Sequence, residues 1–321
     1  MPICGVRTNR LLMALLPLLL AFGAGVPAYA QGDAWKTLND EVESLYKQGQ
    51  YDRALVLAKK ALEVAEKARG PEHPDVATSL NRLAALYQAQ GQYAQAEPLF
   101  NRSLAIREKA LGPDHPSVGT SLNNLAALYQ VQGQYAQVES LHKRALAIRE
   151  KALGPDHPDV AMSLNNLAAL YQDQGQYAKA EPLYKRSLAI REKALGPDHP
   201  DVAQSLNNLA ELYRNQGQYA EAEPLYKRSL AIWEKALGPN HPNVATTLNN
   251  LALMCYTQGQ YAQAEPLYNR SLAIWEKALG PNHPNVAQSL ENLAELYKAT
   301  NRAEEAEALE KRAAAIRAIK R

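Results

Sequence analysis

Glycine recurs every 21 residues along most of the chain, and this interval constrains the fold more than any other feature. The glycines alternate between two contexts, Gly-Gln-Tyr and Gly-Pro-x-His-Pro, so the true repeat is 42 residues long and has two unequal halves. Repetition at a period of roughly 20–50 residues is typical of solenoids, propellers and arrays. The series consists of Gly49, Gly70, Gly91, Gly112, Gly133, Gly154, Gly175, Gly196, Gly217, Gly238, Gly259 and Gly280, and Asn301, which also tolerates a left-handed backbone, takes the next place.

Each half of the repeat has the pattern of one amphipathic helix. Apolar residues recur at helical spacing, and strand signals are absent. In residues 159–174 the apolar positions include Leu164, Leu167, Ala168, Leu170 and Tyr171. Gly196 stands where a helix should end, and Pro200 stands where the next should begin. The sequence therefore predicts a series of helix–turn–helix hairpins.

One such hairpin cannot bury its apolar face alone, whereas stacked copies can, and this predicts an all-α solenoid. We expect about seven hairpins, and the last one is rich in charged residues, as a polar cap should be. The predicted hairpins are residues 35–69, 70–111, 112–153, 154–195, 196–237, 238–279 and 280–318, called hairpins 1 to 7 below. Together they form one continuous solenoid, and residues 319–321 are predicted to be a short basic tail.

The first 30 residues have the layout of a signal peptide. A basic start with Arg7 and Arg10 precedes the apolar run 11–24, and an A-x-A motif ends at Ala30. The run is shorter than the ~20 residues that a bilayer span requires, although an uncleaved anchor is the alternative. We expect cleavage after Ala30, a short linker at residues 31–34, and no membrane span in the mature chain.

Removal of residues 1–30 changes the charge and the cysteine count. It takes away two bases and no acid, so 33 Lys and Arg residues balance 33 Asp and Glu residues. Nucleic-acid binding depends on clustered cationic residues, which a neutral chain does not supply in excess, so we expect no nucleic-acid partner. Only Cys255 remains, which excludes an intrachain disulfide and predicts a buried thiol.

The repeat resembles a known family. Leu164-x-x-Leu167-Ala168-x-x-Tyr171, followed by Gly175-x-Tyr177-x-x-Ala180-x-x-x-Tyr184, is similar to the tetratricopeptide repeat. The 42-residue length with LNNLA, GQY and GPDHPDVA looks like the kinesin light chain subtype, and bacterial proteins with such repeats are common. The resemblance implies a right-handed superhelix whose concave groove holds extended peptide segments, and it leaves the ligand open.

A run of asparagines marks the candidate binding face. If Leu164 is position 4 of its helix, positions 4, 7, 8 and 11 point into the stack and positions 2, 5, 9 and 12 lie roughly opposite. Position 5 is asparagine in six hairpins, and an amide can both donate to and accept from a peptide backbone. The resemblance implies the same role. The alternative is a ladder of asparagines that bond neighbouring helices, and this structural role is the one favoured for the asparagines at position 6.

Most of the few differences between near-identical hairpins lie on the same side. Hairpins 4 and 5 differ at only six of 42 positions, four of which are positions 2, 9, 12 and 13. Tuning to a partner explains this stripe, and neutral drift at exposed sites is the alternative. The predicted contact residues are Asn81, Asn123, Asn165, Asn207, Asn249, Gln130, Gln172, Gln204, Glu211 and Arg214.

Catalytic and metal-binding constellations cannot be placed on this repeat. Six of the seven histidines lie in Gly-Pro-x-His-Pro loops, one per hairpin, too far apart to converge on zinc. We interpret them as parts of rigid loops and helix starts. His142 stands alone and is predicted to be solvated, whereas Trp233 and Trp275 are predicted to pack in the core, with a partner anchor as the alternative. We therefore expect no metal, no cofactor and no catalytic residue.

These observations predict a non-enzymatic scaffold that is exported to the periplasm or secreted. Its partner is expected to be an extended peptide or protein segment bound in the concave groove. The alternative is a self-associating structural or assembly factor of the cell envelope.

Overall fold

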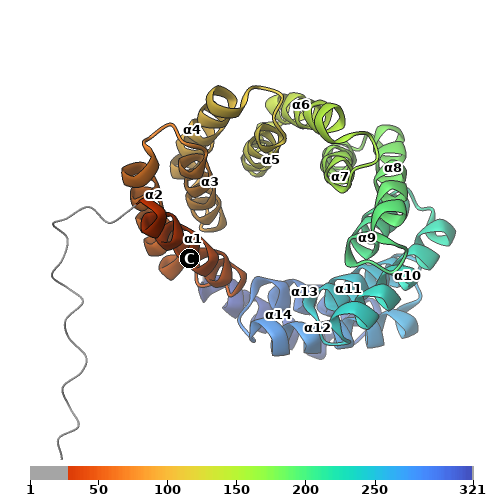
Figure 1. The fold of residues 1–321 in the computed structure, drawn as a ribbon. Coiled ribbons are helices and arrows are strands. Elements are labelled where there is room, and N and C mark those ends of the chain that lie inside the picture. Colours follow the sequence, from red (N-terminus) through yellow and green to blue (C-terminus); the bar gives the residue numbers. More distant parts are fainter. Residues whose placement is uncertain (1–27, 320–321) are drawn as a thin grey trace, which may run out of the picture. The chain divides into compact units, whose positions relative to one another are not determined.

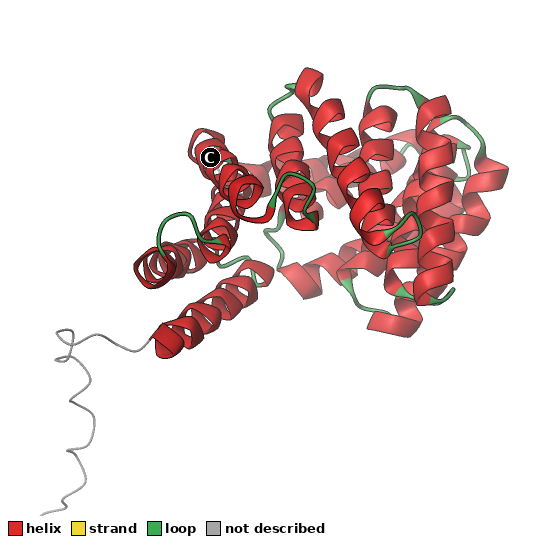
Figure 2. Ribbon diagram, turned by 45° about the horizontal axis from the view of Figure 1, so that its top comes forward, coloured by secondary structure: helices red, strands yellow, loops and turns green. Residues whose placement is uncertain are grey.

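A computed structural model describes residues 28–319 of the chain, and this part consists of helices joined by short loops (Figures 1 and 2). No strand occurs among these described residues. The helices are α1 (Ala28–Lys47), α2 (Tyr51–Arg69), α3 (Pro74–Ala89), α4 (Tyr93–Leu111), α5 (Pro116–Val131), α6 (Tyr135–Leu153), α7 (Pro158–Asp173), α8 (Tyr177–Leu195), α9 (Pro200–Asn215), α10 (Tyr219–Leu237), α11 (Pro242–Thr257), α12 (Tyr261–Leu279), α13 (Pro284–Ala299) and α14 (Ala303–Ile319). They form the helix–turn–helix pairs that the 42-residue repeat predicts.

The ends of the described region differ from the sequence prediction. Helix α1 begins at Ala28, so residues 31–34, predicted as a linker, are helical. This segment has only one alanine and includes Gly32, but it contains no proline that would end the helix before Trp35. Helix α14 includes Ile319, which was predicted to begin the tail. Residues 1–27, which carry most of the predicted signal peptide, and residues 320–321 lie outside the described part.

Glycines with a left-handed backbone close both kinds of turn. Gly175, between the helices of one hairpin, has φ 70°, and Gly196, between hairpins, has φ 89°. A side chain strains this region of φ, so glycine is the residue that fits it best. Asn301 takes the corresponding place in the last turn with φ 60°, as its position in the series predicts.

The loop histidines cap the first helix of each hairpin. His157 precedes Pro158, and its Nδ1 accepts a hydrogen bond from the backbone N–H of Asp159 at 3.1 Å. The cap satisfies a helix N–H that has no partner inside the helix, while proline occupies a place that needs no N–H. The same arrangement occurs at His73, His115, His199, His241 and His283. The prediction of rigid loops and helix starts is confirmed.

The chain groups into two compact units, which divide between Ile106 and Arg107. The boundary falls inside α4, where the sequence shows no linker, and the sequence predicted one continuous solenoid. In the first unit, α1, α2 and α3 pack around buried residues such as Val42, Ala58 and Leu86.

In the second unit, consecutive hairpins pack side by side. The first helices α5, α7, α9, α11 and α13 lie on the inner side of this row, and α6, α8, α10 and α12 lie on the outer side (Figure 1). Buried residues of neighbouring hairpins form shared clusters, such as that of Leu206, Ile232, Leu248, Ile274 and Leu290. The core is therefore a seam that passes from hairpin to hairpin.

Polar contacts add to this seam inside the second unit. Within a hairpin, the Ser187 hydroxyl donates to the buried carbonyl oxygen of Ala161 at 2.8 Å. Between neighbouring hairpins, Arg186 pairs with Glu150 at 2.7 Å on the second helices, and the Tyr171 hydroxyl donates to Glu139 at 3.0 Å. The exposed ion pairs contribute less than the buried bond, because solvent screens them.

Candidate functional site

The solvent-accessible side chains of the first helices lie mainly at positions 2, 9 and 13. In α7 the Met162 side chain is 38% exposed and Asp173 is exposed, while Ala169 is half-buried. In α9, Gln204 and Asn215 are exposed and Glu211 is half-buried. We call the residues at positions 2, 9 and 13 of α5, α7, α9, α11 and α13 the inner face.

Position 5 lies deeper than the helical wheel predicts. Asn123 is 7% exposed and Asn207 is 5% exposed, whereas Asn81, Asn165 and Asn249 are half-buried. The wheel treats the side opposite the core as open to solvent. In a stack, however, the neighbouring first helices also cover part of this side, which is why position 5 is buried or half-buried.

The asparagines form a ladder between neighbouring first helices of the second unit. Nδ2 of a position-6 asparagine donates to Oδ1 of the position-5 asparagine in the preceding hairpin. The Asn208–Asn165 bond is 2.8 Å long. The Asn250–Asn207 bond is 3.4 Å long and the Asn292–Asn249 bond is 3.0 Å long. These contacts support the structural alternative for the asparagine run.

At Asn123 in hairpin 3, a buried histidine takes the place of the position-6 asparagine donor. His142 is 2% exposed, and its Nδ1 donates to Asn123 Oδ1 at 2.9 Å. The prediction that His142 is solvated is wrong, because His142 occupies the core place that Tyr184 and Tyr226 fill in other hairpins. Burial lowers the pKa of His142 to about 4, so the imidazole is neutral at pH 7.

The other predicted contact residues lie beside this ladder and mostly bond to one another or to neighbours. Gln204 Nε2 donates to Asn208 Oδ1 at 2.8 Å. Arg214 Nη2 donates to Glu211 at 3.4 Å and to Asn215 at 2.9 Å, so the structure brings this charged pair together.

Two predicted glutamines lie at the border between hairpins. Gln130 Nε2 reaches Asp173 in the next hairpin at 2.6 Å. The side-chain oxygen of Gln172 is buried and has no hydrogen-bond partner among the described residues.

Buried arginines are a feature that the sequence reasoning missed. Arg191 on α8 is 8% exposed, and its Nη1 donates at 2.9 Å both to the Ser205 hydroxyl and to the Asp201 carbonyl oxygen. Burial lowers the pKa of this guanidinium. Arg107 and Arg149 lie in the same way in hairpins 2 and 3. The signal in the sequence is the serine that follows each arginine 14 residues later.

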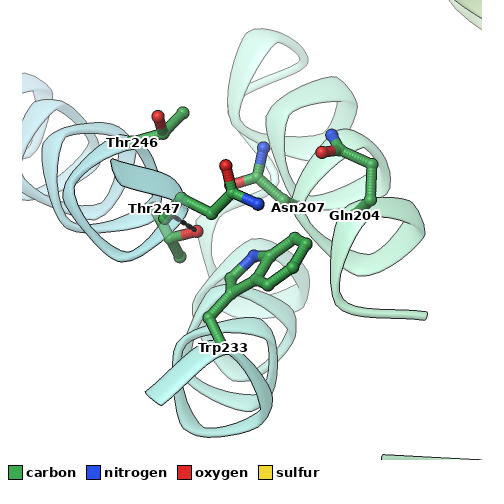
Figure 3. Close-up of a pocket in the computed structure, with 6 residues that line it drawn as sticks. Gln204, Asn207, Trp233, Thr246 and Thr247 are labelled. Atoms are coloured by element: carbon green, nitrogen blue, oxygen red, sulfur yellow. Dashed lines mark hydrogen bonds between the residues drawn. The ribbon is translucent and has the colours of Figure 1, made fainter. Parts of the chain in front are cut away.

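Tryptophan replaces this arginine in hairpins 5 and 6. Trp233 and Trp275 are each 5% exposed, and Cys255 is also buried, as the core interpretation predicts. A cavity of about 100 Å³ lies beside Trp233 (Figure 3). Its lining residues are Gln204, Asn207, Trp233, Asn243, Thr246 and Thr247.

Neither a metal site nor a membrane span is present in residues 28–319. No group of three or more His, Cys, Asp and Glu side chains in this part could hold a metal ion. No helix in the same part combines the length and apolar character that a bilayer crossing requires.

Comparison with known proteins identifies the family. The tetratricopeptide repeat family model matches residues 36–109, 201–274 and 244–318, and the model of the nephrocystin-3 TPR domain matches residues 91–194. These matches cover more than half of the chain, which therefore belongs to the tetratricopeptide repeat family. Members of this family characteristically act as protein-interaction scaffolds.

Solved structures show a similar repeat. A putative kinesin light chain of Podosopora anserina with nearly identical TPR-like repeats is 32% identical, with 66% of this chain and 98% of that one covered and a TM-score of 0.53. BtubC (BKLC) from P. vanneervenii is 27% identical, with 73% and 92% covered and a TM-score of 0.57. The likeness to the kinesin light chain repeat, predicted from sequence, is confirmed.

The ladder predicts different effects for two asparagines at the same repeat position. Asn208→Ala removes the side-chain donor to Asn165 and leaves Oδ1 of the half-buried Asn165 without this partner. We therefore expect the free energy of unfolding to fall by ~1 kcal/mol. Asn166, at the same position in hairpin 4, makes no hydrogen bond through its side chain with the described residues. Asn166→Ala should therefore change stability by less than ~0.5 kcal/mol. Urea unfolding followed by circular dichroism measures both, and equal losses would contradict the ladder.

The buried histidine predicts a pH-dependent stability. An unfolded chain protonates His142 near its ordinary pKa of 6.5, whereas the folded chain protonates it only near pH 4. The unfolded state therefore binds more protons between these values, and stability falls by up to ~3 kcal/mol as the pH drops from 6.5 to 4.

His142→Tyr is the matched control, because tyrosine fills this place in hairpins 4, 5 and 6. Carboxylates also titrate near the lower end of this range, so the informative quantity is the difference between the two proteins. We expect the variant to lose less stability on acidification from pH 6.5 to pH 4. Parallel pH curves for both proteins would show that His142 is not the group responsible.

Proposed function

We propose that the inner face of the second unit binds an extended peptide or protein segment. One observation carries the proposal: hairpins 4 and 5 are nearly identical, yet they differ on this face. Their differences include Met162 against Gln204, Ala169 against Glu211 and Asp173 against Asn215, all at inner-face positions. Among the exposed residues of the outer helices only Lys179 against Glu221 differs, whereas others such as Arg186 and Arg228 stay the same.

The proposal assigns separate roles to two sets of residues. The asparagines at positions 5 and 6 hold neighbouring hairpins in register through their ladder. Inner-face residues, with Arg214 beside Glu211, then choose the partner, because their side chains reach solvent while the backbone beneath them is fixed. This differs from the mechanism expected from sequence, in which the position-5 amides contact the partner backbone.

The fold itself is compatible with a peptide ligand. The Rap conjugation gene regulator of plasmid pLS20 was solved in complex with the Phr* peptide, and it shares this fold with a TM-score of 0.65. At 15% identity this likeness concerns the fold alone. The support for the present chain therefore comes from its own inner face.

The proposal also covers the role and the location of the protein in the cell. We propose a non-enzymatic scaffold without cofactor, exported through the segment 1–30 and acting in the periplasm or outside the cell. Support comes from the basic, apolar and small-residue order of that segment. Self-association at the cell envelope is the second candidate. Light scattering of the purified protein without ligand separates the two, because a self-associating factor forms oligomers without any peptide.

A displayed library of random dodecapeptides provides the probe. A peptide enriched on the protein is synthesised, and its Kd is measured by isothermal titration. Gln204→Ala with Glu211→Ala removes two inner-face side chains, and we expect affinity to fall about tenfold, which corresponds to ~1.4 kcal/mol.

Glu223→Ala with Lys227→Ala is the matched control on α10. These exposed residues pair with each other at 2.5 Å on an outer helix, so their joint removal should leave Kd within about twofold. Loss of binding in the α10 variant alone, or the failure of any peptide to be enriched on folded protein, would contradict the proposal.

A further inference from the structure

Two neighbouring hairpin interfaces of the second unit carry different residues at equivalent buried positions. Between hairpins 4 and 5, the Arg191 guanidinium bonds to the Ser205 hydroxyl and the Asp201 carbonyl oxygen, each at 2.9 Å. Between hairpins 5 and 6, the corresponding residues are Trp233, Thr247 and Asn243. An arginine that donates hydrogen bonds across the interface is thus replaced by an indole with a single donor.

The replacement leaves a small polar pocket, called the Trp233 pocket here and lined by the six residues named above. The hydroxyls of Thr246 and Thr247 both turn to their own helix: Thr246 donates to the Pro242 carbonyl oxygen at 3.2 Å and Thr247 to that of Asn243 at 3.1 Å. The Trp233 indole N–H makes no hydrogen bond with any residue of the part that the structure describes. Figure 3 shows the indole nitrogen on the edge of the ring that faces the side chains of the pocket.

A donor without a protein partner has to be satisfied by water or by a ligand, which makes the Trp233 N–H informative. The Trp233 side chain is 5% exposed, and its indole nitrogen, which faces the pocket, is not among the fully buried atoms that lack a partner. In the next interface the same replacement leaves fully buried groups, because Trp275 Nε1 and the Ser289 hydroxyl have no partners in the described residues. Beside Trp233, however, a cavity of about 100 Å³ can hold a group that accepts a hydrogen bond from the indole N–H.

The chemistry of the lining selects the kind of group. No lining side chain is charged, so a carboxylate or an ammonium group would lose its hydration without a counter-charge. Guanidinium and ammonium groups also carry only donors and cannot accept from the indole. The amides of Gln204, Asn207 and Asn243 can both donate and accept, which suits a neutral ligand with both functions.

The size of the pocket narrows the choice further. A dry cavity that binds benzene measures ~150 Å³, so an aromatic ring is too large. The space corresponds to about three water molecules at ~30 Å³ each, which accommodates a primary amide. The pocket also opens beside Gln204 and Thr246, both exposed on the inner face, so a side chain of a segment bound there can enter.

We propose that the Trp233 pocket binds the side-chain carboxamide of an asparagine or glutamine in the bound segment. The carboxamide oxygen accepts from Trp233 Nε1–H, and its NH₂ group donates to the amide oxygens of the lining. This inference rests on the proposed function, because it assigns one specificity pocket to the inner face. It predicts that the partner presents an amide side chain at the border between hairpins 5 and 6.

Nuclear magnetic resonance can observe the Trp233 indole N–H directly. The chain has three tryptophans, Trp35, Trp233 and Trp275, and therefore three indole cross-peaks in a ¹⁵N correlation spectrum. Propionamide is titrated into the purified protein, with propionate and methylguanidinium as charged probes of similar size. We expect a saturable shift of the Trp233 peak with propionamide at about millimolar Kd, with the other two peaks unmoved and at least tenfold weaker responses to the charged probes.

A variant with Trp233→Arg and Thr247→Ser recreates the arrangement of Arg191 and Ser205 and fills the pocket. Its helicity is checked by circular dichroism, and the side-chain amide peaks of Asn207 serve as the reporter in both proteins. They should respond to propionamide in the native protein and not in the variant.

Three results would overturn the inference: no saturable shift of the Trp233 peak, an equal response to all three probes, or a persistent Asn207 response in the folded variant. The titration uses no peptide, so its outcome is independent of the dodecapeptide experiment. A failed titration together with weakened peptide binding in the Gln204 and Glu211 variant overturns the pocket alone. A positive titration without any peptide binding overturns the proposed function alone.

Discussion

Nearest-neighbour packing is the constraint on which the rest of this structure depends. Each hairpin buries its apolar stripe only against the next copy, so the position of one hairpin on another must be reproduced at every step. Left-handed glycines and histidine caps set where each helix begins and ends. The asparagine ladder and the buried arginines or tryptophans then connect consecutive copies in the second unit. What is left free is the inner face, and there the copies diverge.

The polar contacts of the interfaces differ in how well they are satisfied. The Arg191 arrangement pairs its donors with a hydroxyl and a carbonyl oxygen, whereas the tryptophan interfaces leave an indole N–H without a partner. A buried donor without a partner lowers stability, as at Trp275, so the replacement of arginine by tryptophan calls for a compensating role. At Trp233 the adjoining cavity supplies one, because a ligand can complete the hydrogen bond. In this account the residues around Trp233 therefore contribute both to the stability of the hairpin interface and to ligand recognition.

The sequence predicted what is local and repeated, and it failed where a residue's surroundings come from another hairpin. Helix starts, the rigid loops around His157 and its equivalents, and the buried Cys255 follow from short-range rules, whereas the histidine caps themselves appear only in the structure. His142 looks solvated on its own helix, but it stands at the core position that Tyr184 fills in the next copy. Asn207 was placed on an open face because a wheel for one helix omits its neighbours. The unit boundary inside α4 has no signal in composition.

Photo-crosslinking tests the central claim most directly. A selected dodecapeptide carrying a benzophenone side chain is irradiated on the protein, and the attached residues are identified by mass spectrometry. The account predicts attachment to inner-face residues of α7, α9 and α11, such as Met162, Gln204 and Thr246, which are exposed there. Attachment confined to the outer helices α8, α10 and α12 would contradict it.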